Sequence, residues 1–263
     1  MTAPTFKRSI RDLQVWCSSC MVAFAGADPI AVLIGAKRPG ATLIHKIAVH
    51  PDHRRQGHGR HLLASLGSKL AILGPPRMIA EVPDSFSPAL ALFRAAGYVE
   101  EATLTDYVLT DDASSQTRAD LPRAHAEDLQ GRLLVPVTVD DLLANGLLTD
   151  EQSAVCWSRS IETLTARKDE IAGLAVASDE RLEAYVLYAK QDGASGEIVS
   201  LGSFVDDGGA RLAELLSRLR TGDVSPFCYR KVHPSEFSNN LLGSLGFHAG
   251  GAHRLYAARA TAA

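Results

Sequence analysis

The sequence predicts an α/β fold built from two successive copies of one arrangement. At 263 residues, the chain is long enough for two domains of ordinary size. Segments 6–13 and 157–164 share an aromatic residue, an Arg-Ser-Ile run and a leucine at matching positions. After each segment, short apolar strands alternate with amphipathic helices, which predicts a mixed sheet flanked by helices in each half.

In the first copy, β-rich runs bounded by proline, glycine or lysine predict strands at 21–26, 30–35, 42–49 and 77–82. A helix over 60–73 is predicted by leucines that recur every three or four residues, at Leu62, Leu66, Leu70 and Leu73. A short helix ending in Gly97-Tyr98 follows, and an alternating strand closes the copy.

The second copy repeats this order. Its predicted strands cover 171–177, 184–189, 197–205 and 227–232, with a helix over 210–219. A strand at 132–137 and a helix at 139–144 precede it, and Thr149-x-x-Gln152 predicts a capping box. The first copy either lacks this opening strand and helix or borrows them from elsewhere in the chain.

The predicted domain boundaries follow from these copies and from composition. The N-terminal domain covers 1–112 and the C-terminal domain covers 131–263. A linker is expected at 113–130, within a stretch rich in Asp, Ser, Arg and Ala.

Composition excludes several classes of protein. The content of 46% hydrophobic and 22% charged residues is typical of a globular protein in water. A net charge of −3 argues against a nucleic-acid partner, which needs a basic face. No apolar run approaches the roughly 20 residues that span a bilayer. The polar N-terminus has no signal-peptide core, so we expect a cytoplasmic protein with no membrane partner.

The segment 43–63 contains the most specific pattern: a strand, a proline-containing turn, a basic loop and a helix start. Gly57 and Gly59 allow a tight turn in which successive backbone N–H groups converge. A helix N-terminus at the same point favours anions. The arginines of the loop add charge suited to a pyrophosphate. On these residues alone, a phosphate site and a solvated turn are equally good interpretations.

The full string narrows this choice. Arg54-Arg55-Gln56-Gly57-His58-Gly59 resembles the loop Arg/Gln-x-x-Gly-x-Gly/Ala of the GCN5-related N-acetyltransferases (GNAT). The preceding Ile-Ala-Val-His-Pro and the later Leu-Phe-x-x-x-Gly-Tyr also occur in family order, and the resemblance extends over 21–109. It implies two GNAT-like domains, each with a mixed, mostly antiparallel, twisted sheet flanked by helices.

The resemblance also implies acetyl-CoA as co-substrate. Its pyrophosphate would lie on the amides of Arg55–Arg60, and its pantetheine arm would pair with the backbone of Ile47 and Val49. A backbone amide near Val49 would polarise the acetyl carbonyl. Phe93 would line the thiol end. The residues expected to bind the coenzyme are therefore Ile47, Ala48, Val49, Arg54, Arg55, Gln56, Gly57, His58, Gly59, Arg60 and Phe93.

Acetylation of an amine requires a base and an acid. His45 lies on the strand before the loop, where the similar arylalkylamine N-acetyltransferases carry a histidine, and it is the expected base. The alternative is that His45 only fills a half-buried strand position. Phe93 stands where the family has a tyrosine as general acid, so the proton would come from Tyr98, Tyr107 or water.

Four histidines cluster around the loop, at His50, His53, His58 and His61. They span a strand end, a loop and a helix start without a converging carboxylate or thiol, so no metal is predicted.

At the matching loop the second copy has Asp206-Asp207-Gly208-Gly209 and no arginine. The two carboxylates would repel a pyrophosphate. We therefore expect a degenerate copy that does not bind acetyl-CoA and that packs against the first copy.

The function predicted from the sequence is acetyl-CoA-dependent transfer of an acetyl group to an amine of a small molecule or peptide. One alternative is a non-catalytic acyl-CoA-binding or regulatory module. Another is a mycothiol-synthase-like tandem enzyme, although in those proteins the C-terminal copy keeps the loop. The internal pseudo-twofold arrangement predicts a monomer, and the sequence does not specify the acceptor.

Overall fold

A computed structural model describes residues 3–110, 133–149, 155–190, 195–220 and 225–261. The chain forms two compact units. Unit 1 contains residues 1–104 and 252–263, and unit 2 contains residues 105–251. Two long strands, β5 (Val99–Leu109) and β11 (Phe247–Arg259), contribute residues to both units.

The sheet of unit 1 has the order β1-β2-β3-β4-β11-β5. Its other strands are β1 (Met21–Ala25), β2 (Asp28–Lys37), β3 (Thr42–Val49) and β4 (Arg77–Pro83). Strands β1, β2 and β3 are paired antiparallel, whereas β3 and β4 are parallel. Residues 253–259 of β11 pair antiparallel with β4. The last strand of the chain therefore completes the sheet of the first unit.

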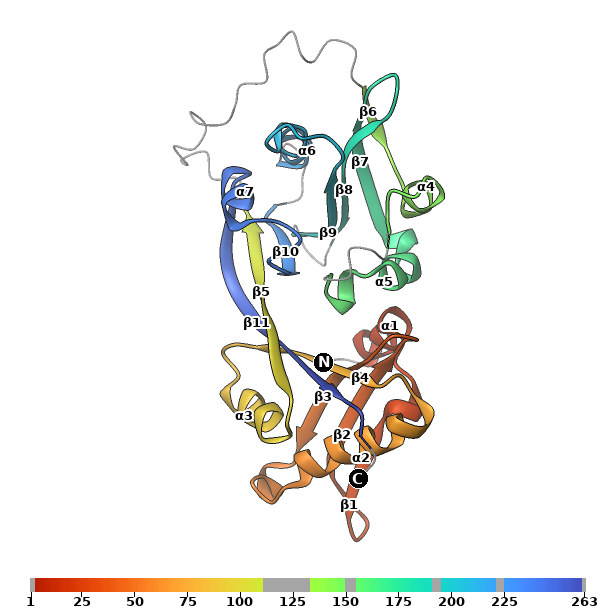
Figure 1. The fold of residues 1–263 in the computed structure, drawn as a ribbon, viewed down its shortest axis with the longest axis vertical. Coiled ribbons are helices and arrows are strands. Elements are labelled where there is room, and N and C mark those ends of the chain that lie inside the picture. Colours follow the sequence, from red (N-terminus) through yellow and green to blue (C-terminus); the bar gives the residue numbers. More distant parts are fainter. Residues whose placement is uncertain (1–2, 111–132, 150–154, 191–194, 221–224, 262–263) are drawn as a thin grey trace. The chain divides into compact units, whose positions relative to one another are not determined.

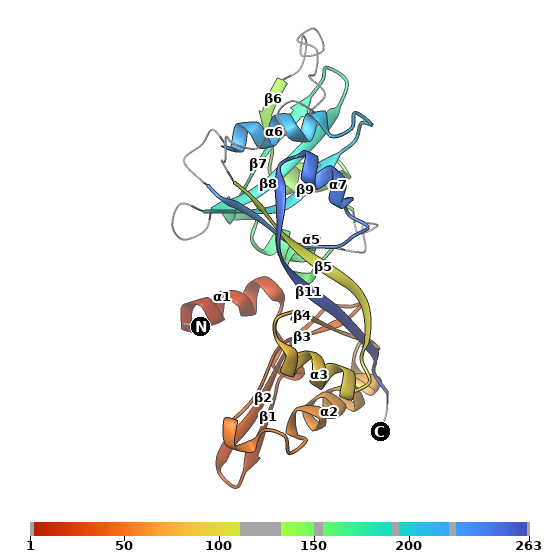
Figure 2. The same ribbon diagram turned by 90° about the vertical axis from the view of Figure 1, so that its left-hand side faces the viewer.

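Helices cover one face of this sheet. They are α2 (His58–Leu73) and α3 (Ser87–Ala95), which lie on the same side of the strands (Figure 2). The predicted leucine stripe of α2 packs with Leu33, Ile44 and residues of β4 in one core. Helix α1 (Ala3–Leu13) and the short turn η1 (Cys17–Ser19) precede β1, and the turn η2 (Pro51–His53) lies between β3 and α2.

Unit 2 has the order β11-β5-β10-β9-β8-β7-β6. Its strands are β6 (Leu133–Pro136), β7 (Ile171–Ala177), β8 (Leu182–Lys190), β9 (Gly196–Ser203) and β10 (Phe227–Val232). Strand β10 is parallel to β9 and antiparallel to β5.

Both faces of the unit 2 sheet are covered. One core contains α6 (Ala210–Arg220) and α7 (Asn239–Ser244). A second core contains α4 (Val139–Ala144) and α5 (Ile161–Ala166), so α6 and α4 lie on opposite sides of β7 and β8 (Figure 1). The turns η5 (Trp157–Arg159) and η6 (Lys168–Glu170) flank α5.

The predicted fold class is confirmed: each sheet is mixed, mostly antiparallel and flanked by helices. In unit 1, no described strand precedes β1, whereas unit 2 opens with β6 and α4. The predicted linker 113–130 and Gln152 of the predicted capping box lie outside the described residues. The sequence division at 131–263 assigned the last strand to the second copy alone, but residues 252–263 belong to unit 1 because they pair with β4.

Among the described helices, none has the length and apolar character needed to cross a membrane.

Candidate active site

The site predicted from the sequence lies where two parallel strands separate. Strand β3 pairs with β2 as far as Val49. On its other edge, the described pairing with β4 consists of Thr42 with Met78 and Leu43 with Ile79. Beyond Leu43 the backbone of β3 has no β4 partner. Because backbone N–H and C=O groups require hydrogen-bond partners, this edge can accept an extended ligand in place of a strand.

A β-bulge places His45 in this part of β3. Ile34 pairs with Lys46 and Gly35 pairs with Ile44, so the register skips His45, which is the extra residue of the bulge. The bulge shifts the alternation of side chains, and Ile47 therefore packs in the same core as Ile44. His45 itself is half-buried. A sequence reading with regular alternation could not locate this irregularity.

The loop after β3 and the first turn of α2 contain backbone amides without acceptors among the described residues. Arg55 and Gly57 have positive φ angles of 63° and 88°, and α2 begins at His58. Among the described residues, no acceptor bonds the amides of residues 55–60. His61 is the first residue of α2 whose amide is bonded, to the Gly57 carbonyl at 3.0 Å. These free donors and the helix dipole together favour an anion.

The side chains of the loop have two kinds of position. Arg54 Nε donates to the Val49 carbonyl at 3.1 Å and so ties the loop to the end of β3. Gln56 Nε2 donates to the Asp52 carbonyl at 3.1 Å. The side chains of Arg55 and Arg60 are exposed, so their charges are accessible to a ligand from solvent.

Gly59 brings α2 close to α3. A Cβ atom at this position would lie 3.1 Å from Leu92 Cδ1. The loop is therefore held against α3, which also carries Phe93.

Phe93 lies in an aromatic cluster in the core of unit 1. Its ring is stacked on Tyr256 of β11, with centroids 6.0 Å apart, and makes an edge contact with Tyr98 at 5.1 Å. The Tyr98 hydroxyl donates to Met78 Sδ at 3.7 Å, and burial raises the pKa of Tyr98. Tyr107, the second tyrosine considered as acid, belongs to the core of unit 2, where its hydroxyl donates to Asn239 Oδ1 at 2.5 Å.

The predicted coenzyme residues thus lie in three connected places. Ile47, Ala48 and Val49 form the end of β3, residues 54–60 form the loop and the first turn of α2, and Phe93 lies beside them on α3. Unbonded amides, exposed arginines and an unpaired strand edge are the groups that a diphosphate joined to an amide-containing arm would need. The residues present fit acetyl-CoA.

The histidines around the loop contact one another through their rings. His53 makes edge contacts with His50 at 5.9 Å and with His58 at 6.2 Å. Within the described ranges, no group of three or more His, Cys, Asp or Glu residues is arranged to hold a metal ion.

The corresponding loop of unit 2 is closed by its own carboxylate. Asp207 accepts hydrogen bonds from the amides of Gly209 at 2.9 Å and Arg211 at 2.8 Å. Arg211 is buried and its Nε donates to Glu183 at 2.8 Å. The donors that face outward in unit 1 are therefore bonded to a side chain in unit 2.

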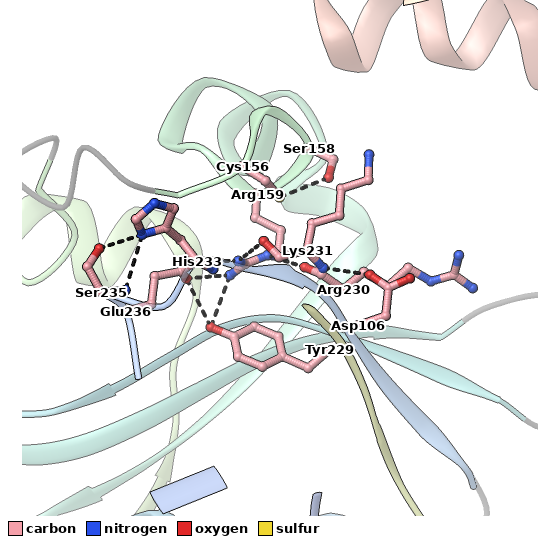
Figure 3. A network of polar contacts seen from close by, with 10 residues as sticks. All are labelled: Asp106, Cys156, Ser158, Arg159, Tyr229, Arg230, Lys231, His233, Ser235 and Glu236. Carbon is pink, nitrogen blue, oxygen red and sulfur yellow. Dashed lines mark hydrogen bonds and ion pairs between the residues drawn. The ribbon is translucent and has the colours of Figure 1, made fainter. Parts of the chain in front are cut away.

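A buried ion pair lies beyond the last β9–β10 pair of unit 2, Ile198 with Tyr229 (Figure 3). Arg159 and Glu236 form two hydrogen bonds of 2.7 and 2.9 Å, with side chains only 2% and 8% exposed. Arg159 also donates to the carbonyls of Arg230 at 2.8 Å and Lys231 at 3.1 Å. The guanidinium group of Arg159 thus bonds the carbonyls of β10 just after its parallel pairing with β9 ends. Sequence reasoning missed this network.

The comparisons with known proteins include a match to the part of the chain that contains this site. Residues 16–100 match the family model described as an acetyltransferase (GNAT) domain. This match defines the class of the domain that contains the candidate site, an acetyltransferase domain.

A curated relative also matches part of the chain. The chain is 40% identical over 72 residues to the [Ribosomal protein bS18]-alanine N-acetyltransferase of Escherichia coli K12, a match that covers 27% of this chain and 48% of that protein. The chain thus spans about half the length of the curated relatives it matches.

Among solved structures, the chain resembles a tandem GNAT protein from the clavulanic acid biosynthesis pathway, with a TM-score of 0.64, 18% identity and coverage of 97% and 87% of the two chains. It also resembles a GCN5-related N-acetyltransferase from Anabaena variabilis, with a TM-score of 0.67, 12% identity and coverage of 99% and 67%. These two likenesses show the fold. Residues 16–100 of the chain therefore form an acetyltransferase (GNAT) domain.

Proposed function

We propose that this protein is an acetyl-CoA-dependent N-acetyltransferase that acetylates an amine of a small molecule or peptide. The observation that carries the proposal is the set of unbonded amides at residues 55–60, located at the end of a strand whose other edge is unpaired. The family assignment supports acetyl transfer in general, and this geometry supports the specific donor.

The chain's own groups account for coenzyme binding. The amides of residues 55–60, with the charges of Arg55 and Arg60, hold the pyrophosphate. The backbone of Ile47 and Val49 pairs with the pantetheine arm. Ala48 lies between them and has a small side chain. An amide near Val49 stabilises the developing oxyanion of the acetyl carbonyl. Arg54 acts differently, because its bond to the Val49 carbonyl fixes the loop.

His45 is the proposed general base. Its position on a bulge, beside the unpaired edge of β3, supports this role. A neutral imidazole there can take a proton from the ammonium group of the acceptor. The resulting amine can then attack the acetyl carbon.

Unit 2 takes no acetyl-CoA in this proposal. Asp207 already bonds the amides at the start of α6, and a carboxylate there repels a diphosphate. This argues against the mycothiol-synthase-like alternative, in which the C-terminal copy keeps the loop. It also implies one coenzyme site per chain.

A peptide α-amine belongs among the acceptors to be tested. The Escherichia coli relative is named for acetylation of an alanine of a ribosomal protein. A panel of small amines, amino acids, aminoglycosides and alanine-initiated peptides, scored by release of CoA, tests the proposal. We expect release that depends on both the chain and one class of amine. Binding of acetyl-CoA without release on any amine would instead favour the non-catalytic module.

A further inference from the structure

Tyr256 is the buried tyrosine of unit 1 whose hydroxyl has no hydrogen-bond partner among the described residues. It lies on β11, and its side chain is completely buried, with 0% exposure. Buried polar atoms are almost always bonded, so such a group calls for an explanation.

The position of Tyr256 connects it to the site. Tyr256 pairs with Ala80 of β4. Pairing of β4 with β3 ends at Ile79, so Ala80 is the first residue of β4 after the two strands separate. The small side chain of Ala80 leaves room for the tyrosine ring on the face covered by α2 and α3. The ring is stacked on Phe93, with an angle of 13° between the planes.

Packing alone does not account for a tyrosine here. A phenylalanine would fill the same volume without burying a hydroxyl that lacks a partner. The cluster already contains Phe93, so aromatic packing does not require the oxygen.

We propose that Tyr256 is the proton donor to the leaving sulfur, in place of the tyrosine that Phe93 replaces. This inference rests on the proposed function. As the amine nitrogen bonds to the acetyl carbon, the carbon–sulfur bond breaks and its electron pair stays on sulfur. Tyr256 Oη gives its proton to that sulfur. The proton released by the amine passes to solvent, and Tyr256 takes a proton back from solvent. The balance is one amine and one thioester converted to one amide and one thiol.

The other tyrosines are less suitable. The Tyr98 hydroxyl is bonded to Met78 Sδ, and Tyr107 belongs to the core of unit 2. Tyr256 comes from residues 252–263, which the second copy of the repeat contributes to unit 1. The acetyl-transfer site of the first copy would therefore need the last strand of the chain.

The first test is kinetic. Tyr256→Phe should lower kcat by about 100-fold, the range of a lost general acid, with little change in KM for acetyl-CoA. Tyr185→Phe, which deletes one hydroxyl from a buried tyrosine in the core of unit 2, is the matched control and should keep kcat within about two-fold. Circular dichroism of both variants checks that they are folded.

The second test does not need turnover. Wild-type protein should bind CoA more tightly than desulfo-CoA by about five-fold, the size of one hydrogen bond to the thiol. Tyr256→Phe should bind the two equally, and Tyr185→Phe should keep the preference. If wild type and Tyr256→Phe prefer CoA over desulfo-CoA equally and both turn over normally, the role of Tyr256 is overturned and the proposed function stands. Failure of wild type to bind either coenzyme would overturn the proposed function together with this inference.

Discussion

Gly57 and Gly59 meet two different demands in the loop before α2. Gly57 has a φ of 88° and no atom within 4 Å of the position of a Cβ, so its requirement is purely conformational. Gly59 has a helical backbone, and its requirement is steric because Leu92 lies so close. The sequence pattern Gly-x-Gly combines both requirements without distinguishing them.

The conformational demand at Gly57 can be measured as stability. Gly57→Ala should lower the free energy of unfolding by about 1 kcal/mol, because an L-residue is strained in the left-handed region. Gly40→Ala is the matched control, since Gly40 also has open space around it and no positive φ. Urea denaturation followed by circular dichroism gives both values. Equal losses in the two variants would contradict the conformational explanation.

His45 is the residue whose role depends most on the bulge in β3. A general base acts in its neutral form, so the wild-type rate should rise from acidic to neutral pH as the base loses its proton. His45→Gln should remove this rise and lower kcat at pH 7 by about 100-fold.

The control for this change is His248→Gln, an exposed histidine of unit 2. It should leave the pH–rate profile unchanged. A wild-type profile in His45→Gln would assign His45 to strand packing instead of catalysis.

At the scale of elements, the helices α2 and α6 show how the same start of a helix can be open or closed. The amides before α2 have no acceptor among the described residues, whereas Asp207 bonds the amides of Gly209 and Arg211 at α6. In unit 2, the Asp207 carboxylate therefore occupies the place at the start of the helix that a bound anion could take in unit 1.

This internal cap should be visible in local dynamics. Asp207→Ala should raise the hydrogen-exchange rates of the Gly209 and Arg211 amides by about five-fold, since loss of a cap costs about 1 kcal/mol. Asp206→Ala, at the exposed neighbouring carboxylate, should leave these rates unchanged. Exchange measured by NMR distinguishes the two. Slow exchange in Asp207→Ala would mean that other contacts protect these amides.

Most elements of both units were predictable because their signals are local. The leucines at 62, 66, 70 and 73 follow helical spacing, and α2 begins only two residues before the predicted start at 60. The bulge at His45 was not predictable, because one extra residue in a strand leaves no recognisable signal in the order of apolar and polar residues. The pairing of β11 with β4 was missed for a related reason: it joins residues far apart in the sequence, and alternation in a strand does not name its partner.

The candidate site divides in the same way. The loop at 54–60 and the strand before it carry a continuous pattern and could be located from sequence. Tyr256 could not, because the sequence assigned it to the other copy. The ion pair of Arg159 and Glu236 was also missed, since each residue alone is an ordinary charged side chain.

At the scale of the whole molecule, the two units share strands but differ at the loop that precedes α2 in one and α6 in the other. Strands β5 and β11 each contribute residues to both units, so neither unit consists of one continuous copy. The open loop lies in unit 1 and the capped loop lies in unit 2. A chain built in this way should have the coenzyme stoichiometry of a single domain.

Isothermal titration with acetyl-CoA should therefore give about one site per chain, with affinity that falls as ionic strength rises, because a diphosphate is held partly by exposed charge. The double variant Arg55→Glu/Arg60→Glu should weaken binding by more than about ten-fold, the equivalent of 1.4 kcal/mol. Arg181→Glu/Lys190→Glu makes the same change of net charge at exposed positions of unit 2 and should leave the affinity nearly unchanged. A stoichiometry of two would show that Asp207 does not exclude the coenzyme from unit 2. Equal losses in the two double variants would mean that the affinity reflects the net charge of the chain and not the loop at residues 54–60.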